Sequence, residues 1–151
     1  FLIGQLEIHA FPVPHDAREP VQYVLADDRY RMGVLTDAGH VTRHIRDALS
    51  GCDALFLEAN HCERLLATGP YPPSLKARVA GRYGHLSNTQ AAEALAAVRS
   101  PRLRHVVAAH LSQQNNTPER AIAAFASALD GAPVELSIAS QDDGCPWIRL
   151  E

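Results

Sequence analysis

Residues 53–58 read D-A-L-F-L-E, a short apolar run that ends in a glutamate. Such a run, bounded by polar residues, is typical of a strand buried inside a sheet. The pattern returns at 104–110, R-H-V-V-A-A-H, where an apolar strand is followed directly by a histidine. Helices are expected between the two strands, at 61–67, 74–83 and 88–98. The alternation of strands and helices predicts a layered α/β fold.

The remaining segments extend this pattern in both directions. Strands are expected at 6–13, 21–25 and 31–36, with Asp27-Asp28 as the turn of a hairpin. A helix is expected at 42–49, and another runs from 118 to 129 with a proline at its first position. Asn88 is the predicted N-cap of the helix at 88–98. Strands at 134–138 and 146–150 are expected to close the chain.

The composition is that of a soluble globular domain. The 151 residues are 46% hydrophobic and 21% charged, and no apolar run approaches the roughly 18 residues of a membrane span. The formal net charge of −3 argues against a broad nucleic-acid-binding surface but allows a local one. Three cysteines, far apart and without a C-x-x-C spacing, are expected to be free thiols in a reducing cytoplasm.

Four polar residues directly follow predicted strands: His15, Asp37, Glu58 and His110. In an open α/β sheet, the strand ends are where binding sites are built. Imidazole and carboxylate ligands together suit zinc or manganese. Taken one at a time, these histidines are more often surface or capping residues than ligands, so this signal alone is weak.

Five ordered motifs carry a resemblance to a known family. They are F-P-V-P-H-D-A at 11–17, T-D-A-G at 36–39, L-E-A-N-H at 57–61, G-H-L-S-N at 84–88 and A-H-L-S-Q-Q-N-N at 109–116. Together they resemble the metallo-β-lactamase-fold hydrolases, most closely the bacterial YycJ-like (WalJ-like) branch. That branch is similar to ribonuclease Z and other metal-dependent phosphodiesterases.

The resemblance implies roles for individual residues. His15, Asp37 and His110 would be ligands of two divalent metal ions, zinc or manganese, with Asp37 bridging them and a hydroxide activated between them. Glu58 and His85 would form a proton-handling pair, in which the carboxylate orients the imidazole. The alternative is that Glu58 caps a helix and His85 is an ordinary loop residue.

Four further residues are candidates for supporting roles. Asp16 follows His15 and could orient a ligand, and His61 could lie just behind the site. Arg78 and Arg82 would share one face of the predicted helix and could pair with phosphate. A solvated helix face is an equally good reading of the two arginines.

The family's histidine cluster, H-x-H-x-D-H, is absent from residues 1–151. The resemblance therefore implies a single partial domain, the C-terminal half of an αββα sandwich, in a chain that begins within a longer protein. The missing N-terminal half or a second chain would cover one apolar sheet face. The implied function is a cytoplasmic, metal-dependent phosphodiesterase or exonuclease acting on nucleic acid. Alternatives are a lactonase or thioesterase of the same fold, or a non-catalytic half-domain that binds a partner.

Overall fold

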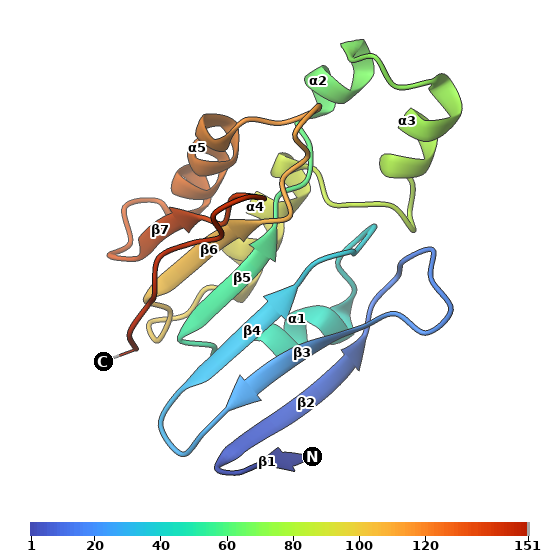
Figure 1. The fold of residues 1–151 in the computed structure, drawn as a ribbon. Coiled ribbons are helices and arrows are strands. Elements are labelled where there is room, and N and C mark those ends of the chain that lie inside the picture. The colour runs from blue at the N-terminus through green and yellow to red at the C-terminus, as the bar shows by residue number, and fades with distance from the viewer. Residues whose placement is uncertain (151) are drawn as a thin grey trace.

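The computed structural model describes residues 1–150, which form one seven-stranded sheet in the order β1-β2-β3-β4-β5-β6-β7 (Figure 1). The strands are β1 (Leu2–Ile3), β2 (Leu6–Pro12), β3 (Val21–Ala26), β4 (Arg31–Leu35), β5 (Ala54–Glu58), β6 (His105–Ala109) and β7 (Glu135–Ile138). Pairing is antiparallel from β1 to β4 and parallel from β4 to β7. The predicted hairpin and the predicted α/β segment are therefore parts of one mixed sheet. The short β1 was not expected from the sequence.

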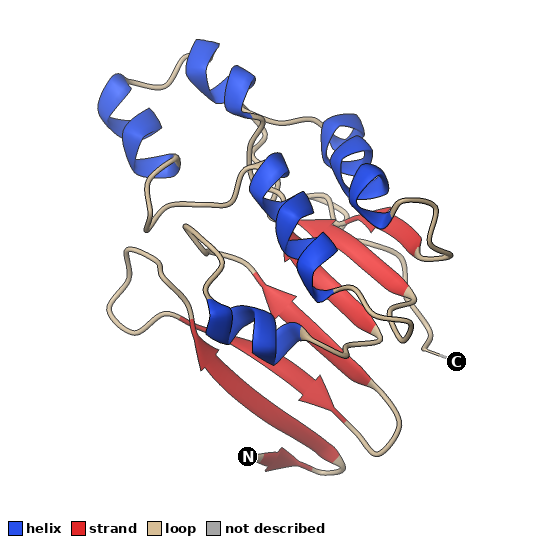
Figure 2. Ribbon diagram, turned by 180° about the vertical axis from the view of Figure 1, so that it is seen from behind, coloured by secondary structure: helices blue, strands red, loops and turns tan. Residues whose placement is uncertain are grey.

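Three helices cover one face of this sheet: α1 (Arg43–Leu49), α4 (Asn88–Val98) and α5 (Pro118–Leu129) (Figure 2). Each helix turns apolar side chains toward the strands, and Ile45, Leu95 and Phe125 are completely buried. Burying a side chain of this size stabilises the fold by about 1.5–3 kcal/mol. No helix within residues 1–150 is both long and apolar enough to cross a membrane.

The helices begin at hydroxyl caps. Thr42 caps α1 and Thr117 caps α5 through their side-chain oxygens. The N-cap of α4 is Ser87 rather than Asn88, so that prediction is wrong by one residue. Ser87 accepts from the backbone N–H of Gln90, whose side chain in turn accepts from the N–H of Ser87. The side chain of Asn88 instead forms hydrogen bonds with Asn116.

The two faces of the sheet differ because side chains alternate along each strand. The row facing the helices consists of Val24, Gly33, Leu55 and Val106. The neighbouring row, on the opposite face, consists of Tyr23, Val34, Phe56 and Val107. Tyr23 is 39% exposed, and Val34 and Phe56 are only partly buried. The sheet thus has one face packed under helices and one apolar face without them.

The C-terminal segment crosses part of that second face. Residues 146–150, predicted as a strand, pair with no strand in the part of the chain that the structure describes. Pro146 has no N–H to donate to a ladder, and Trp147 is fully exposed, so neither pairing nor burial favours a strand. The segment instead runs past β6 and β7 (Figure 1). Trp147 and Ile148 line a hollow there with His105 and Ser137.

Residues 62–84 leave the sheet as an excursion that carries α2 (Glu63–Thr68) and α3 (Pro73–Val79) beyond its carboxyl edge (Figure 2). The predicted helix at 74–83 ends at Val79, four residues early. Gly84 explains the early end: a Cβ at this position would lie 2.2 Å from the carbonyl oxygen of Val79. The chain folds back under the helix end there, and the N–H of His85 donates to Val79. This reversal brings His85 to the sheet edge.

Candidate metal centre and catalytic pair

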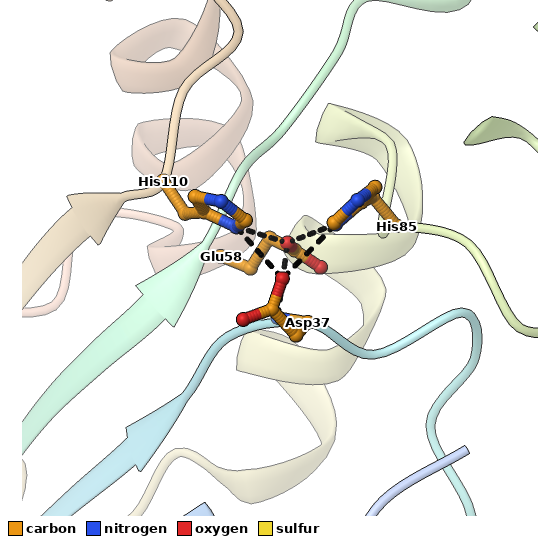
Figure 3. A group of neighbouring side chains, drawn as sticks. All are labelled: Asp37, Glu58, His85 and His110. Atoms are coloured by element: carbon orange, nitrogen blue, oxygen red, sulfur yellow. Dashed lines mark hydrogen bonds and ion pairs between the residues drawn. The ribbon is translucent and has the colours of Figure 1, made fainter. Parts of the chain in front are cut away.

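The parallel strands β4, β5 and β6 deliver Asp37, Glu58 and His110 to one edge of the sheet, and the loop after α3 adds His85 (Figure 3). Asp37 and His110 both have left-handed backbones, with φ of 52° and 55°. That conformation is uncommon in residues other than glycine and often accompanies functional sites. One ligand-type atom from each of the four residues lies within 4.8 Å of the others.

Glu58 is the centre of this cluster, and its side chain is completely buried. Its Oε1 accepts from Nδ1 of His85 at 2.9 Å, from Nδ1 of His110 at 2.8 Å and from the N–H of Asp37 at 3.2 Å. Its Oε2 accepts from the N–H groups of Leu86 at 2.9 Å and Ala38 at 3.3 Å. Five donors therefore converge on one carboxylate.

This environment keeps Glu58 ionised. Burial by itself raises the pKa of a carboxyl, but the hydrogen bonds from His110, His85 and the Leu86 amide outweigh it and lower the pKa of Glu58 to about 2. The hydrogen bond to Glu58 raises the pKa of His110, against the opposing effect of burial. An anionic Glu58 holds the ring proton of each imidazole on Nδ1, which leaves Nε2 of each free for another partner.

His15 approaches the cluster from the loop that follows β2. Its Nδ1 donates to the carbonyl oxygen of Gly84 at 3.0 Å, and its Nε2 lies 3.8 Å from Oδ1 of Asp37. The same Asp37 oxygen lies 3.6 Å from Nδ1 of His110. The structure thus brings His15, Asp37 and His110 together, as the motifs suggest. Their roles as ligands stay a prediction.

The donor chemistry of these three residues fits a divalent metal. Ligand atoms about 2.0–2.2 Å from zinc lie about 3–4 Å from one another, and the separation between His15 and Asp37 is in that range. Both histidines have Nδ1 engaged by a protein acceptor, the arrangement that orients an imidazole toward a metal through Nε2. A second possible ligand set would replace His15 by Glu58 and His85. The five donors already on Glu58 favour the first set.

His61, for which a supporting role is predicted, lies three residues beyond Glu58 and forms an isolated bridge with Ser87. It is only 2% exposed, and its Nδ1 has no hydrogen-bond partner among residues 1–150. Burial lowers the pKa of His61, so its ring is neutral at physiological pH. Its backbone carbonyl accepts from the N–H of Asn88. A supporting role for His61 stays a prediction.

The arginines are placed differently from the sequence prediction. Because α3 ends at Val79, Arg78 and Arg82 do not share a helical face, and that prediction is wrong. Arg78 forms an ion pair with Asp16, and this pair lowers the pKa of Asp16. Asp16 Oδ1 also lies 3.5 Å from Nε2 of His15. Arg82 is exposed, and its carbonyl oxygen accepts from His40.

Three buried asparagines connect the loops of the site, a role that the sequence did not predict for any of them. Asn88 and Asn116 join their side-chain amides reciprocally, at 2.9 and 2.8 Å. Asn116 also donates to the carbonyl oxygen of Ala59 and accepts from the N–H of Thr117. Asn60 donates to the carbonyl oxygen of His110. Asn60 is the fourth residue of L-E-A-N-H, whereas Asn88 and Asn116 end G-H-L-S-N and A-H-L-S-Q-Q-N-N, so membership of the motifs was the available signal.

Comparison with known families agrees with this geometry. A family model described as a β-lactamase superfamily domain matches residues 1–111. The chain belongs to the β-lactamase superfamily. The predicted fold family is therefore confirmed, and the mixed α/β sheet with its helices matches that fold.

Individual members of the superfamily resemble the chain to different degrees. The exodeoxyribonuclease YycJ of Bacillus anthracis is 35% identical over 127 residues, which are 84% of this chain and 48% of that protein. The chain thus spans about half the length of the relative. Among solved structures, the metallo-β-lactamase fold protein YhfI of Bacillus subtilis superposes with a TM-score of 0.67 at 14% identity, covering 97% of this chain and 51% of that one. The short form of human tRNase Z gives 0.55 at 21% identity, covering 75% and 38%.

Proposed function

We propose that this chain is the portion of a metal-dependent phosphodiesterase that carries the catalytic pair, and that the complete protein cleaves nucleic acid. The observation that carries the proposal is the buried Glu58, which fixes two imidazoles at once. The name of the 35% identical relative, an exodeoxyribonuclease, supports DNA as the substrate class. A lactonase or thioesterase would share the fold and the metal ligands, but the 35% identity is to an exodeoxyribonuclease.

His15, Asp37 and His110 would hold two divalent ions, zinc or manganese, with Asp37 between them. Bound there, the ions would supply Lewis acidity to the attacking water and to the departing oxygen. Oδ1 of Asp37 lies 3.8 Å from Nε2 of His15 and 3.6 Å from Nδ1 of His110, so one carboxylate oxygen lies close to both imidazoles. The backbone strain at Asp37 and His110 is consistent with side chains aimed by the fold at a common point.

Glu58 and His85 would handle the proton. With Nδ1 held by Glu58, His85 can carry a second proton on Nε2 and deliver it to the leaving oxygen. His85 is exposed enough to do so: its side chain retains 22% of its accessible surface and lines a cavity beside the site. Glu58 stabilises the charged imidazole and keeps its orientation.

The remaining ligands would come from outside this chain. We infer that an N-terminal half of the same protein supplies a histidine cluster and packs against the open sheet face, where Leu6, Val21 and Tyr23 are exposed. Apolar surface of this kind is characteristic of an interface. The cysteines are free thiols, and this is consistent with a cytoplasmic enzyme.

Two variants of the complete protein test the assignment. His85→Ala should lower kcat for a small chromogenic phosphodiester by about 10²–10⁴-fold while the metal content stays unchanged. Asp37→Ala should lose metal and activity together. Metal content is measured by plasma mass spectrometry, and rates are measured with zinc and with manganese.

The same experiment contains the results that would contradict the proposal. Loss of metal in His85→Ala would make His85 a ligand and end its proton-handling role. Cleavage of lactones or thioesters, with no phosphodiester cleaved under either metal, would overturn the nuclease assignment. The ligand assignment would survive that second result.

A further inference from the structure

A cavity of about 390 Å³ opens beside the catalytic pair, between the excursion at 62–84 and the loop that follows β6. His85 and His110 form part of its wall. The volume lies at the lower end of the range for small-molecule pockets, about 300–1,000 Å³. The cavity has room for one nucleoside and shares two residues with the proposed centre.

The lining of this cavity is neutral apart from the two histidines. Asn60, Asn115, Gln113, Gln114 and Gln141 bring five carboxamides to it, whereas no Lys, Arg, Asp or Glu contributes to the wall. Arginine and lysine usually supply the contacts to phosphate, so this wall is poorly suited to hold the nucleic-acid backbone. Carboxamides offer a donor and an acceptor side by side, which matches the edge of a nucleobase.

Two of the amides are available to a ligand. The side chains of Gln113 and Gln114 form no hydrogen bond with any other residue in the range 1–150, and both residues are exposed. Asn60, by contrast, already donates to His110. The cavity also contains one aromatic side chain, Tyr71, which is partly buried. An aromatic ring beside free amides is the combination that binds unstacked bases by stacking and by edge hydrogen bonds.

We propose that this cavity, the carboxamide pocket, receives the base of the unpaired nucleotide at the end of a nucleic-acid strand. The proposal rests on the proposed function, since it takes the metal centre as the place where the phosphodiester is cleaved. Only an unpaired base exposes its hydrogen-bonding edge and both ring faces, so the pocket would select frayed or single-stranded ends. His85 and His110 belong to both sites, so a base bound here keeps the adjoining phosphate near the catalytic pair.

The test compares two single-stranded oligonucleotides, one intact and one whose terminal nucleotide lacks its base, with the abasic residue placed at either end in turn. The complete wild-type protein should cleave the intact end with a kcat/KM about 5- to 150-fold higher, the usual effect of one stacked base. In Tyr71→Ala, and further in Tyr71→Ala combined with Gln113→Ala and Gln114→Ala, this ratio should fall toward one.

Tyr83→Ala is the matched control. Tyr83 is a tyrosine of the same excursion that is 60% exposed and lies outside the pocket wall, so its removal should leave the wild-type ratio unchanged. An intact-to-abasic ratio near one in the wild type, or a full ratio in the triple variant, would overturn the proposal.

Binding measurements keep this result separate from the proposed function. Fluorescence anisotropy of the same two oligonucleotides with metal-free protein reports on base recognition without any cleavage. A preference for the intact end that disappears in Tyr71→Ala supports the pocket even if no phosphodiester is cleaved. Equal affinities would overturn the pocket even if the enzyme proves to be a nuclease.

Discussion

Strand β5 has a buried carboxylate at each end, and the two are held in different ways. At its start, Asp53 accepts from the N–H of Arg31 at 2.9 Å and from the guanidinium of Arg102 at 3.0 Å. At its end, Glu58 accepts from two imidazoles and three backbone amides. Both side chains are almost inaccessible to solvent, at 4% and 0%. Their partners, not their burial, distinguish them.

The difference predicts a structural role for Asp53 and a chemical role for Glu58. Arg102 is always charged, so its ion pair with Asp53 does not depend on pH near neutrality, and it connects the loop before β6 to the start of β5. An imidazole, unlike a guanidinium, can gain and lose a proton in the physiological range. The two imidazoles beside Glu58 contact it through Nδ1 and keep Nε2 outside that contact. A carboxylate that orients titratable groups can take part in a reaction, whereas one fixed to a guanidinium can only hold the fold.

The largest expected effect is on catalysis by Glu58→Gln. All five neighbours of Glu58 are hydrogen-bond donors, so the NH₂ group of a glutamine would face at least one of them and lose that hydrogen bond. The substitution would also remove the negative charge that stabilises protonated His85. We expect kcat for a phosphodiester to fall by about 10²–10⁴-fold in the complete protein. Asp53→Asn should leave kcat unchanged and should lower the free energy of unfolding by about 1–3 kcal/mol, because it weakens buried hydrogen bonds.

Steady-state kinetics well below each melting temperature, together with urea unfolding, measure the two effects. Near-ultraviolet circular dichroism verifies that Glu58→Gln remains folded. Equal losses of kcat in two folded variants would show that the two ends of β5 do not differ in function.

The second expected effect concerns acid stability without metal. The pKa of Glu58 is about 2 in the folded protein, against an ordinary value of 4.5, so this group stabilises the fold above pH 4.5. That contribution, about 3 kcal/mol, is lost as the pH falls from 4.5 toward 2. Urea unfolding in the presence of a chelator should show a shallower loss between pH 5 and pH 3 in Glu58→Gln than in the wild type. Parallel curves for the two proteins would contradict the role of Glu58 as a buried anion.

Much of the fold and of the site was predictable from local patterns. Short apolar runs ending in Glu58 and His110 identify buried strands, and strand ends in an α/β sheet meet at one edge. Hydroxyls and a proline mark the helix starts, as at Thr117 and Pro118. The motifs then supplied the residues that a strand pattern misses, above all His15 and His85, which reach the site from loops.

Most of the wrong predictions share a physical cause, which is dependence on contacts that sequence periodicity does not reveal. The end of α3 is decided by how closely Gly84 approaches Val79, and periodicity alone does not reveal this approach. The pairing of Arg78 with Asp16 joins residues 62 positions apart, so helical spacing could not predict it. The mostly apolar residues 146–150 resemble a strand in sequence, yet they form no backbone pairing with any strand of the sheet.

A smaller effect is expected from the joined amides of Asn88 and Asn116, which connect the loops bearing His85 and His110. Asn116→Ala leaves Asn88, Ala59 and Thr117 without buried partners and should destabilise the protein by about 2–3 kcal/mol. Asn116→Asp retains the acceptor for Asn88 and Thr117 and should lie between the wild type and the alanine variant. Thermal unfolding of the three proteins gives the order. An alanine variant as stable as the wild type would show that the amides are not a structural link.

The smallest effect is expected from the exposed ion pair between Arg78 and Asp16. Arg78 is 68% exposed and Asp16 keeps 34% of its surface, so Arg78→Ala should leave Tm unchanged, because exposed ion pairs contribute little. Arg102→Ala provides the comparison and should lower Tm, since it leaves the buried Asp53 without its cation. The KM for single-stranded DNA, measured over a range of salt concentrations, decides whether Arg78 also binds phosphate. With Arg78 engaged by Asp16, we expect the salt dependence to be the same in wild type and Arg78→Ala. A shallower salt dependence of KM in the variant would show that Arg78 binds phosphate in the wild type and that Asp16 releases it when nucleic acid binds.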